Sequence, residues 1–210
     1  AQASARQEAG EVVVDGVFSH LSVAENPARD RDTDQQRDAF RRAVAAVRER
    51  GLTPSWVHLA NTAAALRRPD LHFDMVRIGI GTYGLSPLGR DEPTAVPLTP
   101  ALSLHTVLSG VKRLPAGHGV SYGGRFVTDE PTWIGLVPVG YGDGLPRAAT
   151  GLHVTVRGRA RPVLGVIAMD QLVVALGTDR ESPDDRPRAG DEVVVISTDG
   201  VNTVDDWATA

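Results

Sequence analysis

The sequence predicts a parallel α/β segment followed by a mainly antiparallel β-domain. Up to about residue 90, apolar β-branched runs alternate with helical patterns, which indicates parallel βα units. A cluster of prolines follows. After it come six short β-rich runs separated by Gly and Pro, a spacing typical of an antiparallel sandwich or barrel.

Three strands are expected in the first segment, over residues 11–20, 56–60 and 75–80. Their short apolar runs are rich in β-branched residues, as in strands that are buried on both faces. Three parallel strands with partial helical cover leave sheet edges open. We therefore interpret residues 1–92 as the last strands and helices of a larger α/β domain.

Two helices are expected between these strands. Residues 21–32 are polar and predict a loop. Thr33, with a glutamine three residues later, is a candidate capping box for a helix that stops at Gly51. A second helix over residues 63–68 must end near Pro69, because proline cannot continue a helix.

A domain boundary is expected where Pro93, Pro97 and Pro100 break the chain. The β-domain would then occupy residues 97–210. Its strands are predicted over residues 101–111, 132–139, 152–156, 163–167, 172–176 and 192–196.

Two further segments are expected in the β-domain. Residues 178–190, rich in Asp, Arg and Pro, predict a solvated loop whose charges need no functional explanation. Thr203, followed by two aspartates, predicts the start of a helix that is cut off at Ala210. Both ends of the sequence are therefore expected to be truncated.

The composition excludes several classes of function. The absence of cysteine removes disulfides, thiolate zinc sites and cysteine nucleophiles, and no histidine pair has metal-ligand spacing, so no metal is expected. A net charge of −4 gives no electrostatic reason to expect nucleic acid or a membrane surface. No apolar run approaches the roughly 20 residues of a membrane span. With no apolar signal core at the N-terminus, a cytoplasmic protein is expected.

Five phrases carry the functional signal: His58-Leu-Ala-Asn-Thr-Ala, Arg77-Ile-Gly-Ile-Gly-Thr-Tyr-Gly, Ala116-Gly-His-Gly-Val-Ser-Tyr-Gly, Gly140-Tyr-Gly-Asp-Gly and Ile167-Ala-Met-Asp-Gln. In this order, and across the boundary between the α/β and β segments, they resemble alanine racemase from Val12 onward. The family fold is a (β/α)₈ barrel followed by a β-domain. The resemblance therefore implies the last three barrel strands and most of the β-domain.

The resemblance implies a pyridoxal-phosphate-dependent isomerase that interconverts L- and D-alanine for peptidoglycan. Racemisation by two bases needs one proton-transferring group on each face of the substrate. Tyr122 matches the family's catalytic tyrosine, and His20 and Arg77 match the histidine and arginine that assist it. In the family this tyrosine acts on cofactor held by the other subunit, so a head-to-tail homodimer is implied.

Other matches imply the binding residues. Arg77 would hydrogen-bond the pyridine nitrogen of the cofactor, and its fixed charge would keep that nitrogen unprotonated. The positions that match the phosphate site are Asn61, Thr62, Gly79 and Ile80, with threonine where the family usually has serine. Those that match the substrate side are Met169 through its backbone N–H, Tyr141 at the entrance and Asp170 in the loop.

The family's second base is a lysine that also holds the cofactor. Lys112 is the only lysine among 22 basic residues, and it lies in the β-domain rather than at the end of a barrel strand. We therefore expect the 210 residues to lack the cofactor lysine and to be inactive alone. The remaining histidines, His58 among them, are expected to be structural.

Three alternatives stay open to different degrees. A serine or broad-spectrum racemase of the same fold is possible, because side-chain selectivity depends partly on residues near Tyr141. A basic-amino-acid decarboxylase is disfavoured, since that branch of the fold places an acid where Arg77 stands. From another class, the chain could be an inactive β-domain module that binds a partner.

Overall fold

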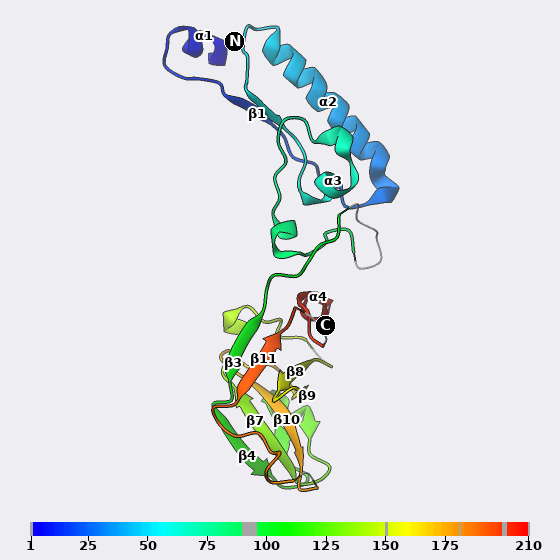
Figure 1. Cartoon of the computed structure of the whole chain (residues 1–210), viewed down its shortest axis with the longest axis vertical. Coiled ribbons are helices and arrows are strands. Elements are labelled where there is room, and N and C mark those ends of the chain that lie inside the picture. The colour runs from blue at the N-terminus through cyan, green and yellow to red at the C-terminus, as the bar shows by residue number, and fades with distance from the viewer. Residues whose placement is uncertain (1, 90–95, 150, 181, 199–200, 210) are drawn as a thin grey trace. The chain divides into compact units, whose positions relative to one another are not determined.

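The computed structural model of the chain describes residues 2–89, 96–149, 151–180, 182–198 and 201–209. It forms two compact units, residues 1–101 and residues 102–210, each described separately below (Figure 1). The expected boundary proline Pro93, the predicted domain end at residue 92 and the predicted helix end at Ala210 lie outside the described residues.

The strands of the first unit pair in parallel, as the sequence predicts. β1 (Gly16–Phe18) lies beside β2 (Trp56–His58), with Phe18 opposite His58. The expected third strand is wrong in extent. Its pairing is limited to an isolated parallel bridge between His58 and Met75 and to a hydrogen bond from the Arg77 amide to the Ala60 carbonyl.

A glycine-rich turn explains the short third strand. Gly79 has φ −104° and ψ −93°, which departs from extended backbone, and the 3₁₀ helix η3 (Ile80–Tyr83) follows at once. Gly84 then takes a left-handed conformation with φ +74°. A Cβ at Gly84 would lie 1.8 Å from the Thr99 carbonyl oxygen, so the close passage of these two segments requires glycine.

The main difference between the predicted and observed helices is the start of α2. α1 (Gln2–Glu8) precedes the first strand. α2 (Asp30–Arg48) begins before Thr33, so the predicted capping box is wrong and part of the predicted 21–32 loop is helical. The 3₁₀ turn η1 (Pro27–Arg29) leads into α2, and aspartates in the first turn of α2 stabilise its positive end. Thr33 is instead buried inside the helix.

The second predicted helix is confirmed. α3 (Thr62–Arg67) ends before the 3₁₀ turn η2 (Pro69–Leu71), and the Asn61 side chain caps it by accepting from the Ala64 amide at 3.1 Å. The core of the unit gathers residues of α2, β2, α3 and their flanking loops: Leu21, Ala24, Phe40, Val44, Val57, Leu59, Ala60, Ala63, Ala64, Leu71 and Leu88.

An ion-pair network ties α2 to α3 and η2. Arg68 bonds Asp70 at 2.8 Å and Asp34 at 2.6 Å, and Arg37 also reaches Asp70 at 3.0 Å. Hydrogen bonds from Arg68 and then Arg37 hold the pKa of the Asp70 carboxyl well below its usual range, against the opposing effect of burial. The network therefore favours the ionised carboxylate.

The second unit is built on a seven-stranded antiparallel sheet with the order β3-β11-β8-β9-β10-β7-β4. Its strands are β3 (Leu104–Val107), β4 (Gly110–Leu114), β7 (Thr132–Val137), β8 (His153–Val156), β9 (Arg159–Leu164), β10 (Leu172–Thr178) and β11 (Glu192–Ile196). A small hairpin pairs β5 (Gly119–Val120) with β6 (Phe126–Val127).

The two outermost strands of this sheet are one bent run of chain. The run predicted as a single strand from residue 101 splits at Leu108 and Ser109. The Leu108 amide donates to the Asp191 carbonyl beside β11, whereas the Ser109 amide donates to the Leu136 carbonyl of β7. The sheet therefore curls so that its first and last strands meet end to end, which supports the predicted antiparallel β-domain.

The curled sheet encloses the core of the second unit. Alternate residues of its strands are buried, among them Val154, Val156, Val174 and Leu176. The predicted strand over 163–167 lies too late, because β9 ends at Leu164 and Gly165 turns the chain with φ +69°. β5 and β6 were not predicted.

The C-terminal helix closes one end of the sheet. α4 (Val204–Thr209) follows Thr203, as predicted, and the Thr203 amide donates to Asp206 at 2.8 Å while the Asp206 amide donates to the Thr203 hydroxyl at 3.3 Å. The Trp207 indole donates to the Val195 carbonyl at 2.9 Å, which docks the helix on the core. In the part of the chain described, no helix combines the length and apolar character that a membrane crossing requires.

The Asp70 network predicts a pH-dependent first unit. Because the pKa of Asp70 is lowered in the folded state, its ionised carboxylate stabilises the fold at pH values above its unfolded pKa of about 4. This contribution is lost as the pH falls through the folded pKa. We expect Asp70→Asn to destabilise α2 by about 1 kcal/mol at pH 7, allowing for solvent screening, and to flatten the loss of stability at acid pH. Hydrogen exchange of the α2 amides measures both effects.

Asp32→Asn is the matched control, since Asp32 pairs only with the exposed Arg29 within one turn. Its effect on exchange should be smaller at pH 7. Equal protection in the Asp70 and Asp32 variants would contradict a central role for the network.

Candidate functional site

Arg77 gathers three segments of the first unit around its guanidinium. Nη1 lies 2.8 Å from Nδ1 of His58, and Nη2 lies 3.0 Å from Nδ1 of His20. Nη2 also donates to the Ser19 carbonyl at 3.0 Å. The arginine itself is positioned by its own amide, which donates to the Ala60 carbonyl. The predicted pair His20 and Arg77 is thus brought together.

The arginine fixes the tautomers of both imidazoles. A guanidinium can only donate hydrogen bonds, so Nδ1 of His20 and of His58 must accept. In the neutral ring the proton is then on Nε2. Burial, and next the charge of Arg77, lower the pKa of His58 from its usual value, which also favours the neutral ring. His20 is exposed, and its Nε2–H is available as a donor.

An aromatic contact orders the same cluster. The rings of Phe18 and His58 stack with centroids 5.2 Å apart and an interplanar angle of 5°. The Arg77 Cζ lies 5.8 Å from the Phe18 centroid. Sequence reasoning took His58 as structural and did not single out Phe18. Only the parallel register, which sets Phe18 opposite His58, could have revealed this cluster.

The predicted phosphate residues lie on two adjoining turns of the first unit. The Gly79 amide donates to the buried Thr62 hydroxyl at 3.0 Å, and Ile80 follows in η3. A Cβ at Gly81 would lie 2.8 Å from Thr62 Cγ2, so glycine permits this close packing. A Cβ at Gly79 would meet no atom within 4 Å, so the backbone there faces open space. The Asn61 side chain is engaged as the cap of α3.

In the second unit, Tyr122 begins the 3₁₀ turn η4 (Tyr122–Gly124) and is 66% exposed. The residue before it, Ser121, has φ +64°, and its hydroxyl donates to the Val166 carbonyl. A Cβ at Gly165 would lie 2.8 Å from Ser121 Cβ. The tyrosine is therefore presented outward from a backbone that is held in an uncommon conformation by a tight contact.

Tyr141 and Met169 lie on two loops that are bonded to each other. The Tyr141 amide donates to the Ala168 carbonyl at 3.0 Å, and the Gly142 amide donates to the Met169 carbonyl at 2.8 Å. A Cβ at Gly140 would lie 2.2 Å from the Ala168 oxygen, so the approach requires glycine. The 3₁₀ turn η5 (Tyr141–Asp143) is closed by the Asp143 carboxylate, which accepts from Gly140 at 2.9 Å.

The side chains of the two loops differ in exposure. Tyr141 is half-buried, whereas Met169 and Asp170 are exposed at the tip of the neighbouring loop. The phrases Gly-Tyr-Gly-Asp-Gly and Met-Asp-Gln, separate in the sequence, thus form one structural element.

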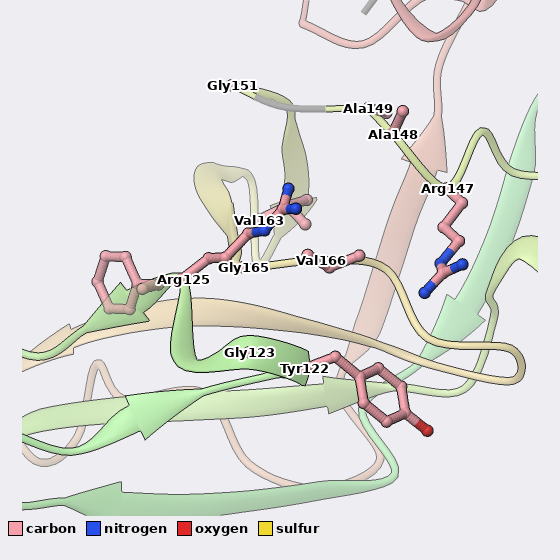
Figure 2. Close-up of a pocket in the computed structure, with 11 residues that line it drawn as sticks. Tyr122, Gly123, Arg125, Arg147, Ala148, Ala149, Gly151, Val163, Gly165 and Val166 are labelled. Carbon is pink, nitrogen blue, oxygen red and sulfur yellow. The ribbon is translucent and has the colours of Figure 1, made fainter.

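A cavity of about 690 Å³ opens beside Tyr122 in this unit (Figure 2). Arg125 and Arg147 contribute to its lining, together with small residues such as Ala148 and Gly165. The Arg147 Cζ lies 5.5 Å from the Tyr141 centroid. Neither arginine forms an ion pair with a carboxylate of the described residues, so the cavity is suited to an anionic group. Neither arginine was predicted to be a site residue.

Comparisons with known proteins agree with the motifs. Residues 1–87 match the family model described as "Alanine racemase, N-terminal domain", and residues 101–210 match "Alanine racemase, C-terminal domain". A Thermobifida fusca relative named alanine racemase is 49% identical, over 100% of this chain and 55% of its own length. The chain spans about half the length of the curated relatives it matches.

Solved structures show the same fold. The Streptomyces lavendulae alanine racemase has a TM-score of 0.84 and 42% identity, covering 99% of this chain and 54% of that one. The Bartonella henselae alanine racemase, described with covalently bound pyridoxal phosphate, has a TM-score of 0.75 and 27% identity over 95% of this chain and 52% of its own.

The Arg77 cluster predicts the titration of His58. We expect His58 to titrate below the reference pKa of about 6.5 and to show Nε2 protonated and Nδ1 unprotonated at pH 7. Long-range nitrogen-15 NMR of the imidazoles measures both. In Arg77→Gln the pKa of His58 should rise only in part, because burial, the larger cause, remains.

Protonation of His58 at Nδ1 in the unaltered chain would contradict the assigned tautomer.

Proposed function

The chain belongs to the alanine racemase family, and from this premise we propose that it serves the pyridoxal-phosphate-dependent interconversion of L- and D-alanine. Such an isomerase would supply D-alanine for peptidoglycan, in the cytoplasm. The observation that carries the proposal is the Arg77 guanidinium held by two histidines, in a chain that also presents Tyr122 beside a cavity. In this proposal residues 1–92 are part of a (β/α)₈ barrel and residues 97–210 form the β-domain.

The residues of the first unit fit the cofactor. Pyridoxal phosphate would supply the electron sink for the negative charge left at Cα. Arg77 would bond the pyridine nitrogen, and the cofactor's phosphate would be held by Thr62, Gly79 and Ile80, with Asn61 keeping the start of α3 in place. The open space at the Cβ position of Gly79 supports this assignment, because it leaves room for a phosphate beside the main chain. The Gly79 amide would keep the Thr62 hydroxyl in place, and the Ile80 amide would donate to the phosphate.

Arg77 would act by donating and never accepting. Because a guanidinium keeps its proton, Arg77 would leave the pyridine nitrogen unprotonated and so would limit the side reactions that a stronger electron sink permits. His58 and the Ser19 carbonyl accept from its two terminal nitrogens, which holds the guanidinium in one orientation. His58 is thereby a positioning residue.

Tyr122 would be the base on one face of the substrate. Its phenolic oxygen would take the proton from Cα of one enantiomer and return it in the reverse direction. The Nε2–H of His20 is free to donate to that oxygen and to stabilise its negative charge. In the proposed head-to-tail homodimer, His20 belongs to one subunit and Tyr122 to the other.

The loops of the second unit would bind the substrate. The Met169 backbone N–H would donate to the amino acid's carboxylate, Asp170 would order that loop, and Tyr141 would narrow the entrance. The uncompensated Arg125 and Arg147 favour approach of a carboxylate. The bonded loops around Gly140 support these roles, because they hold the two segments in one fixed relation.

We do not assign the second base of the racemisation to Lys112. Lys112 lies on β4 of the seven-stranded sheet, whereas the Arg77 cluster belongs to the first unit. We therefore propose that the 210 residues alone do not racemise alanine.

A chimeric enzyme tests the proposal. Joining this chain to the preceding part of the Thermobifida fusca relative should give a pyridoxal-phosphate enzyme that racemises L-alanine faster than L-serine. Tyr122→Phe should lower kcat by about 10²- to 10⁴-fold, the usual contribution of a general base. It should still permit exchange of the Cα proton of one enantiomer, by the remaining base. A racemisation assay in deuterated water measures both.

Tyr83→Phe provides the control, since Tyr83 is an exposed tyrosine outside the proposed machinery. It should leave kcat unchanged. Racemisation by the isolated 210-residue chain, or full activity of the Tyr122 variant, would overturn the proposal; faster turnover of serine would redirect it to a broader racemase.

A further inference from the structure

A second cavity of about 460 Å³ lies on the outer face of the curled sheet. Its floor is apolar and includes Leu114, Ile134, Leu136 and Val173. Its polar lining residues are Lys112, His118, Gln171, Ser121 and Tyr122.

The strand register explains why a lysine lines an apolar floor. Lys112 and Leu114 alternate along β4 and so share one face, and Lys112 is directly opposite Ile134 of β7. Ile134 is 2% exposed and Leu114 5%, whereas Lys112 is exposed. The aliphatic stem of Lys112 can therefore follow the floor while its ammonium group stays at the solvent side.

The charge of Lys112 is not compensated locally. No aspartate or glutamate lines the cavity, and Lys112 forms no ion pair within the described residues. The neighbouring Asp179 is committed elsewhere, since it binds the Arg113 guanidinium and accepts from the Trp133 indole at 3.0 Å. A cation beside an apolar surface selects a ligand with an anionic head and an apolar tail.

The residue at position 112 is a lysine rather than an arginine. Of the 22 basic residues, Lys112 is the only one that is not arginine. An ammonium group is a compact point charge with three donors, whereas a guanidinium is a wide planar fork.

We propose that this cavity is a binding site for short-chain monocarboxylates. The carboxylate pairs with the Lys112 ammonium and accepts from Gln171 or His118, and the alkyl chain lies over Leu136 and Val173. Because Ser121 and Tyr122 also line the cavity, an occupant contacts the segment that presents Tyr122. Binding itself does not depend on the proposed racemase function.

The single lysine makes the site directly observable. Reductive methylation with carbon-13 labels only Lys112 and the N-terminal amine, and it keeps the lysine charge. NMR titration of the 210-residue chain with propionate, butanoate and hexanoate should shift the Lys112 signal saturably, with Kd on the order of a millimolar. Affinity should rise about fourfold per methylene, which corresponds to about 0.8 kcal/mol for each buried CH₂. Hexanol should not shift it.

Variants of the unmodified chain, followed by ligand-observed NMR, provide the controls. Lys112→Gln should weaken hexanoate binding at least tenfold, whereas Arg159→Gln, which removes an exposed cation of β9 outside the cavity, should not. Val173→Phe keeps the charge and fills the floor, so it should weaken hexanoate but not acetate, and it tests the site even if the Lys112 variant fails to fold. Shifts that do not saturate, equal binding of hexanol, or hexanoate binding that survives both Lys112→Gln and Val173→Phe would overturn the proposal.

Discussion

The chemistry of the first unit depends on one guanidinium that can only donate. Arg77 lies where the third parallel segment leaves β2, and it binds groups from the β1 and β2 segments at once. Its permanent charge sets the tautomers of two histidines without any further partner. The local backbone, the ring orientations and the proton positions are therefore consequences of a single side chain.

The second unit depends on a different constraint, which is the close approach of main-chain segments at two glycines. Gly140 and Gly165 stand where a Cβ would collide with a neighbouring segment, and each brings a candidate site residue into place. Tyr141 and Met169 are held by backbone hydrogen bonds, so their positions depend little on their own side chains. Among the glycines of the sequence motifs, Gly140 is explained by this packing.

The sequence predicted what depends on local pattern and missed what depends on register. α3 was correctly located, because Asn61 caps it and Pro69 ends it. β11 was correctly located, because a run of β-branched residues favours a strand. The start of α2 was missed because the acidic first turn at Asp30 outweighs the Thr33 pattern. Tyr122 and Arg77 were singled out by motifs and His20 by the resemblance to the family, and their roles stay predictions. His58 was missed, since only the pairing of β1 with β2 brings it to Phe18, and Arg147 was missed because its cavity forms in three dimensions.

The curled sheet has a consequence for how the two units behave when made separately. Its outermost strands are short, five residues or fewer, and joined through Leu108, so the second unit presents little continuous edge to another chain. In the first unit, Phe18 and Trp56 are exposed on a two-stranded sheet whose outer edge has no partner among the described residues. Recombinant residues 102–210 should accordingly stay dispersed at concentrations where residues 1–101 aggregate, which makes the β-unit the better starting point for crystallisation.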